Sequence, residues 1–102
     1  MFGKLGDMMG KLQEMKQKAE EIKTSLGNTI IKSESAGGDI VIEINGNREI
    51  KSLRLADSLQ HGDKKELENH LLTALNKAIK EADKVNEAEM KKAASGLLPG
   101  IS

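Results

Sequence analysis

The sequence contains no cysteine, and Phe2 is its one aromatic residue. Without cysteine, disulfides, thiol catalysis and zinc–thiolate sites are excluded, and this composition is typical of cytosolic proteins. With so few aromatic residues, domains that stack bases on aromatic side chains, such as the RRM and many OB folds, are poor candidates. We therefore expect a cytoplasmic protein whose function depends on none of these chemistries.

Neither sign of charge is in excess, because 16 Lys and Arg residues balance 16 Asp and Glu residues. Any binding to nucleic acid must therefore come from how the charges are arranged. No apolar run approaches the roughly 20 residues that a membrane helix needs, and no signal-peptide core is present. The 102 residues match the size of one domain, so we expect a single domain over residues 1–102 and no membrane partner.

Apolar residues recur at every second position only in the centre of the chain, between Asp39 and Leu55. This period indicates half-buried strands, and the Asn-Gly-Asn sequence at 45–47 tolerates the left-handed backbone of a tight turn. A weaker pattern predicts one more strand before this region. The predicted meander consists of strands over residues 29–35, 39–45 and 48–55.

One face of the central predicted strand is formed by Ile40, Ile42 and Ile44. A hairpin alone is marginally stable, and burying one isoleucine is worth roughly 1.5–3 kcal/mol, so this face requires a cover. In the next strand Ile50 and Leu53 are three positions apart, so either a bulge places them on one face or both faces are partly covered. We expect a second copy of the chain to provide the cover. The candidate dimer-interface residues are Ile40, Ile42, Ile44, Ile50 and Leu53.

A heptad pattern precedes the strands. Its apolar residues are spaced 4, 3, 4, 3 and 4 apart, which predicts an amphipathic helix over residues 7–26 with a seam for a partner helix. Asp7 is the candidate N-cap, and Gly27 is the candidate terminator. The seam consists of Met8, Leu12, Met15, Ala19, Ile22 and Leu26.

A longer helix is predicted after the strands. Asp63 and Glu66 resemble a capping box, and the apolar stripe that follows predicts a helix over residues 64–94, with Gly96 ending it and a tail over residues 95–102. Such a helix is about 45 Å long, whereas a compact 100-residue domain is about 35 Å across. We therefore expect an α+β fold whose two helices leave the sheet as an arm, and a twofold homodimer joined through the sheets.

The sequence indicates no catalytic or metal site. His61 and His70 are the two histidines, and neither is spaced from acidic residues as in a metal-binding motif. No nucleophile elbow frames a serine, and Leu12 stands where a P-loop requires Ser or Thr after its lysine. We expect no enzymatic activity, no cofactor, no metal and no small-molecule substrate.

Lysines recur on one side of the second predicted helix and in two seven-residue repeats on the first, Lys4, Lys11 and Lys18 in one and Lys16 and Lys23 in the other. One interpretation is a solvated face balanced by neighbouring glutamates, which is what charged runs usually form. The other is a phosphate-contacting surface, because lysine is a flexible point charge suited to phosphate contact without base readout. The candidate DNA-binding residues are Lys4, Lys11, Lys16, Lys18, Lys23, Lys77, Lys80, Lys84 and Lys91.

Four segments, taken in order along nearly the whole chain, carry a family resemblance. They are MFGKLGDMMGKLQEMKQKAEEI at the start, SAGGDIVIEINGNREIKSLRL in the centre, Asp57-Ser58-Leu59 before the long helix, and GLLPG near the end. Together they resemble the YbaB/EbfC family of nucleoid-associated proteins. The resemblance implies a helix–strands–helix fold and a tweezer-like homodimer around the sheets. It also implies that the helical arms bind double-stranded DNA in the bacterial nucleoid, with effects on DNA conformation and gene expression.

A protein-interaction module is the alternative function. In that case the helical arms, with the heptad seam and the Leu97-Leu98-Pro99 tail, dock a partner protein, and no DNA binding is expected even at low salt. The nucleoid interpretation instead predicts binding that weakens steeply as salt is added.

Overall fold

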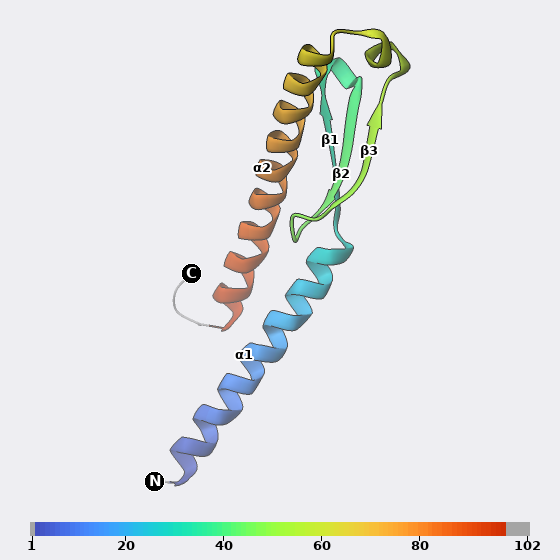
Figure 1. Cartoon of the computed structure of the whole chain (residues 1–102). Helices are drawn as coiled ribbons and strands as arrows, with labels where there is room; N and C mark the ends of the chain where they lie inside the picture. The colour runs from blue at the N-terminus through green and yellow to red at the C-terminus, as the bar shows by residue number, and fades with distance from the viewer. Residues whose placement is uncertain (1, 98–102) are drawn as a thin grey trace.

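The computed structural model describes the chain from Phe2 to Leu97, and side chains from Gly6 to Ser95 except Gln60. Two long helices are separated by a three-stranded sheet (Figure 1), which confirms the predicted α+β class. The main elements are α1 (Phe2–Asn28), β1 (Ile30–Ser35), β2 (Ile40–Asn45), β3 (Ile50–Leu55) and α2 (Lys64–Leu97). The 3-10 turn η1 (Ala36–Gly38) joins β1 to β2, and η2 (Asp57–His61) lies between β3 and α2.

Both helices are longer than the sequence pattern predicts. α1 begins at Phe2, so Asp7 lies inside the helix and does not cap it; the apolar spacing that predicts the helix continues upstream of Asp7. α2 continues to Leu97, so Gly96 does not end it. A glycine in a helix interior costs only about 1 kcal/mol relative to alanine, which a long helix tolerates. The rest of the predicted tail, residues 98–102, lies outside the described part of the chain.

The sheet is an antiparallel meander in the order β1-β2-β3, and it contains a bulge. Ile44 lies opposite Ile50, and Ile42 lies opposite Leu53. Positions 42–44 on β2, three residues, therefore match positions 50–53 on β3, four residues, which leaves Lys51 as the extra residue. The bulge confirms the first of the two alternatives, because it keeps Ile50 and Leu53 on the same face as the isoleucines of β2.

The core lies between the sheet and α2, which packs on β1 and β2 (Figure 1). The inward-facing residues of β2 are at most 1% exposed, and so are the α2 residues that they meet. The α2 residues are small, which lets the helix backbone come close to the sheet. The facing sets are Ile40, Ile42 and Ile44 on β2, and Ala74, Ala78 and Ala82 on α2.

This packing corrects the expectation that a second copy covers the isoleucine face. Ile40, Ile42 and Ile44 are already buried by α2 of the same chain, so they do not lie on an open surface. Ile50 and Leu53 on β3 remain 44% and 46% exposed, because α2 does not extend over β3. Of the five candidate interface residues, these two are therefore accessible to another molecule.

α1 projects away from this core as an arm (Figure 1). The molecule measures 71 × 23 × 18 Å, so it is far more elongated than a compact domain of this length. Every residue from Gly6 to Glu21 is exposed, whereas Ile22 is half-buried and Leu26 is only 1% exposed. The C-terminal end of α1 is thus anchored in the fold, and the preceding four turns are free.

Candidate nucleic-acid interface

The tight turn between β2 and β3 anchors both helices. The backbone N–H of Gly46 donates to the carbonyl of Leu26 at 2.8 Å, and the side-chain amide of Asn47 donates to the carbonyl of Lys23 at 2.8 Å. On the other side, the Asn86 amide of α2 donates to the carbonyl of Gly46 at 2.8 Å. The turn therefore hydrogen-bonds to backbone carbonyls in the last two turns of α1, and it links α1 to α2.

Gly46 is required at this point of the turn. A Cβ atom there would lie 2.6 Å from Leu26 Cδ2 and 3.0 Å from the Leu26 carbonyl oxygen, closer than real Cβ contacts. The glycine thus allows the turn to approach the last turn of α1 closely enough to hydrogen-bond with it.

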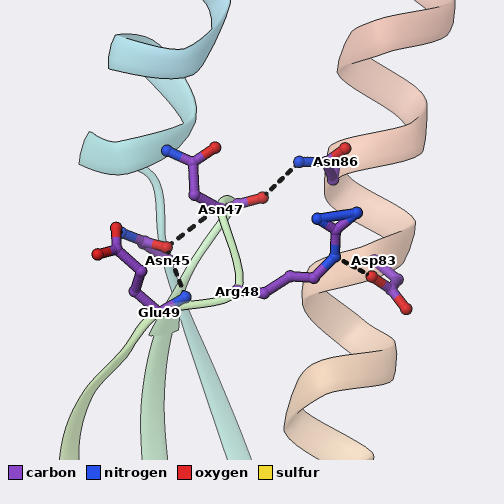
Figure 2. Close-up of polar contacts among 7 residues, drawn as sticks. Asn45, Asn47, Arg48, Glu49, Asp83 and Asn86 are labelled. Carbon is purple, nitrogen blue, oxygen red and sulfur yellow. Dashed lines mark hydrogen bonds and ion pairs between the residues drawn. The ribbon is translucent and has the colours of Figure 1, made fainter.

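Side chains within the turn hold its shape (Figure 2). The side-chain oxygen of Asn45 accepts hydrogen bonds from the backbone N–H groups of Asn47 and Glu49, both at 2.9 Å. The Asn45 amide donates to the Glu49 carboxylate at 2.9 Å, and this bond is the main cause of a lowered pKa for Glu49, to which the charge of Lys51 adds. Asn45 is 1% exposed, so its side chain lies in the protein interior, whereas its partner Glu49 is exposed.

Arg48, also in the turn, forms an ion pair with Asp83 on α2 (Figure 2). Arg48 has a left-handed backbone, with φ of 66°. Both side chains are close to half-exposed, at 46% and 45%, so the pair contributes modestly to stability. The pair shows that the flank of α2 that carries Asp83 lies beside the β2–β3 turn.

The free part of α1 displays an apolar seam to solvent. Met8 and Leu12 are each 63% exposed, and Met15 is 50% exposed. The seam continues into Ile22 and Leu26, which pack against the rest of the fold. The exposed residues of the seam therefore lie on the same face of α1 as the residues that pack against the fold.

The described lysines of α1 are all exposed and lie beside this seam. In heptad terms they occupy the two positions that flank the apolar residues, about 60–80° from the seam centre at 100° per residue. The carboxylates of the same segment lie farther around the helix, about 100–140° from the seam centre, and Glu21 forms an exposed ion pair with Lys18 at 4.0 Å. The flanking lysines are Lys11, Lys16, Lys18 and Lys23. The carboxylates are Asp7, Glu14, Glu20 and Glu21. The side chain of Lys4 lies outside the described residues.

The candidate lysines of α2 are also exposed, and they form a separate surface. They lie about 140–180° around the helix from Ala93, which borders α1. Lys77 additionally donates a hydrogen bond to the Glu34 carbonyl of β1. A single chain therefore does not bring these four candidate lysines of α2 onto one surface with the lysines of α1. The four α2 residues are Lys77, Lys80, Lys84 and Lys91.

A cleft of about 450 Å³ lies where α1 meets α2. Lys18 and Ile22 line it from α1, and Glu89, Lys92 and Ala93 line it from α2. Lys92 is not among the sequence-predicted residues, because it lies about 100° from the stripe that contains Lys91. The structure shows that Lys92, unlike that stripe, lines the same cleft as Lys18 of α1.

A second exposed feature is the apolar surface beside β3, which we call the β3 patch. On β3 it contains Ile50 and Leu53; on α2 it contains Leu72, which is 62% exposed, and Ile79, which is 37% exposed. The flank of α2 that carries these residues also carries Asp83, the partner of Arg48 in the β2–β3 turn. The residues of the β3 patch therefore lie on one side of the molecule.

Neither of the described helices combines the length and the apolar character needed to cross a lipid bilayer. The two histidines are both exposed.

The fold and these surfaces define a small α+β protein with helical arms that carry lysines. The model of the YbaB/EbfC DNA-binding family matches residues 1–97, and the chain belongs to this family. A nucleoid-associated protein of Flavobacterium johnsoniae is 43% identical over 94 residues, covering 92% of this chain and 88% of the relative. One of Hahella chejuensis is 32% identical, covering 93% of this chain and 88% of the relative.

The fold also matches a solved structure. The crystal structure of the uncharacterized protein HP0035 from Helicobacter pylori superposes with a TM-score of 0.74 at 31% sequence identity. The match covers 89% of this chain and 94% of that chain. That protein therefore shares this fold, in which a three-stranded sheet lies between two long helices in the order of the chain.

Proposed function

We propose that this protein is a nucleoid-associated protein that binds double-stranded DNA, chiefly through contacts between lysines and phosphates. Family membership and the names of the two bacterial relatives support this function. The observation that supports the residue assignment is the arrangement of charge on α1, where exposed lysines flank the apolar seam on both sides and the carboxylates lie farther from it. The role is one of binding, not catalysis, and its location is the nucleoid of the bacterial cytoplasm.

The arrangement of charge explains how a chain without net charge can bind a polyanion. Four lysines and four carboxylates occur between Asp7 and Lys23, so this segment has no net charge. Because the lysines lie nearer the seam than the carboxylates do, a phosphate backbone that approaches the seam is closer to the positive charges than to the negative ones. The binding is predicted to be modest in strength and sensitive to salt.

We further propose that the protein acts as a homodimer joined through the β3 patch. The patch is apolar, faces solvent and lies beside the uncovered strand of the sheet, which is a surface that a second copy can bury. Ile50 and Leu53 retain their proposed interface role, now together with Leu72 and Ile79. A twofold dimer carries every arm twice, so it can contact two stretches of duplex and alter DNA conformation.

A gel shift on random-sequence duplex at low and high salt tests the DNA-binding function. Binding at low salt that weakens steeply with added salt is the expected result. Reversing the charge of Lys11, Lys16 and Lys18 is expected to weaken it, while the same change at Lys64 and Lys65, beyond the sheet from the arm, serves as the matched control. No shift at low salt, together with a co-purifying protein, would instead favour the protein-interaction module.

A further inference from the structure

We propose that the free part of α1 lies in the major groove of duplex DNA, with Leu12 and Met15 facing the base edges. In this arrangement the lysines on the two sides of the seam contact phosphates of the two strands. The inference rests on the proposed DNA-binding function. It further specifies the face of the helix that contacts DNA, the groove that the helix occupies and the role of the apolar residues.

The charges of α1 determine the direction of approach. Lys11 and Lys18 flank one side of the seam, and Lys16 and Lys23 flank the other. The opposite face of the helix carries only carboxylates as charged groups between Asp7 and Glu21. A polyanion therefore meets positive charge on both sides only when it approaches the seam itself, so the exposed Leu12 and Met15 must point toward it.

The same charges disfavour a second α1 helix as the occupant of this seam. In a coiled coil, the residues that flank the seam of one helix lie beside the flanking residues of its partner. Here the charged flanking residues are lysines on both sides, so α1 paired with α1 would place lysine beside lysine in either orientation. The seam is therefore complementary to an anionic partner and not to itself.

The dimensions of the arm match the major groove. An α-helix with its side chains is about 10–12 Å across, which fits a major groove about 12 Å wide and exceeds a minor groove about 6 Å wide. The twelve residues from Gly6 to Gln17 are all exposed. They span about 18 Å, which corresponds to roughly five base pairs.

The chemistry of the apolar residues limits what they can read. Leu12 and Met15 cannot form the hydrogen bonds that identify a base, but they can pack against the C5-methyl group of thymine, which projects into the major groove. Burying one methyl group is worth roughly 0.8 kcal/mol, or about a fourfold difference in affinity. The arm is therefore expected to favour duplexes that display thymine methyl groups, with little dependence on their order.

The test compares two duplexes of one A·T-containing sequence, one with thymine and one with uracil in its place, by fluorescence anisotropy at low salt. The wild type is expected to bind the thymine duplex about fourfold tighter for each methyl group contacted. The variant Leu12→Gln/Met15→Gln is expected to lose this preference and to keep salt-dependent binding. Both side chains are at least half exposed, so the variant is expected to fold. Gln13→Ala/Gln17→Ala, on the far face, is the matched control and keeps the preference.

Protection of guanine N7 from dimethyl sulfate provides a second readout, because N7 lies in the major groove. Equal affinity for the two duplexes, with no N7 protection and with binding still present, would overturn the major-groove arrangement while the DNA-binding function stands. Absence of binding to either duplex at low salt would overturn the proposed function as well. Loss of the preference in the Gln13→Ala/Gln17→Ala control would also contradict the assignment, because those residues face away from the seam.

Discussion

Asn86 on α2 donates a hydrogen bond to the carbonyl of Gly46 at 2.8 Å, across 40 positions of sequence. Both residues are buried, with Asn86 only 8% exposed. Gly46 in turn donates to Leu26 at the end of α1, so one residue of the turn contacts both helices. The direction in which the α1 arm leaves the core therefore depends on a polar contact, since buried polar groups are costly to leave without a partner.

We expect Asn86→Ala to lower the free energy of unfolding by about 1–3 kcal/mol, because the buried Gly46 carbonyl loses its donor from α2. Urea denaturation measures the change. Asn76→Ala, at an exposed position on the same helix, is the control and is expected to be nearly neutral. Equal denaturation midpoints for Asn86→Ala and the wild type would show that the bond does not stabilise the fold.

Gly46→Ala is expected to destabilise the protein by about 1–3 kcal/mol, in the range of other overpacking substitutions. The added methyl group would overlap Leu26, so the turn must move away from α1. Gly27→Ala is the matched control, since its added Cβ meets only the Asn47 side-chain nitrogen at 3.4 Å. Thermal unfolding compares the two variants, and a larger loss for Gly27→Ala than for Gly46→Ala would contradict the described contact.

Leu53→Asp is expected to abolish self-association without unfolding the chain, because it places a charge in the exposed β3 patch. Sedimentation should then give the chain mass of 11.1 kDa, in place of twice that mass for the wild type. Ile42→Asp is the contrasting variant and is expected to unfold the protein, since Ile42 lies in the core of one chain. A wild-type protein that sediments as a monomer at micromolar concentration would refute the proposed dimer.

The lowered pKa of Glu49 predicts an effect of pH on stability. Because the pKa is lower in the folded state, the contribution is present above the ordinary value of 4.5 and is lost as the pH falls through the lowered value. Asn45→Ala removes the main cause and is expected to return the pKa of Glu49 toward 4.5. An NMR titration of the Glu49 carboxyl measures both values. A pKa that is the same in wild type and Asn45→Ala would show that the hydrogen bond is not the cause.

Periodicity alone was enough to predict several parts of the fold. The alternation around Ile42 predicts β2, and the three-position gap between Ile50 and Leu53 predicts the bulge as one of two alternatives, since both depend on local backbone geometry. Periodicity did not predict which element packs over the isoleucine face of β2. This packing depends on how α2 returns across the sheet, and the stripe of Ala78 and Ala82 does not by itself show which surface it contacts.

The candidate site shows the same division between local pattern and tertiary placement. The heptad spacing of Met8, Leu12 and Met15 predicts a seam, and the lysines beside it can be identified from the same pattern. The angle at which the two helices leave the sheet decides two further features. It leaves this part of the seam exposed, and it turns Lys84 and Lys91 away from α1. This angle is set by hydrogen bonds between residues distant in sequence, which periodicity does not predict.

The central claim is that lysines of α1 contact DNA phosphates. The most direct test measures how DNA affinity depends on salt, in the wild type and in Lys11→Gln/Lys16→Gln/Lys18→Gln. If these lysines contact phosphates, the slope of log K against log salt is expected to fall by roughly 0.9 for each contact removed. Glu14→Gln/Glu20→Gln, farther from the seam of α1, is expected to leave the slope unchanged. A slope that is the same in the lysine variant and the wild type would contradict the assignment of α1 as the arm that binds DNA.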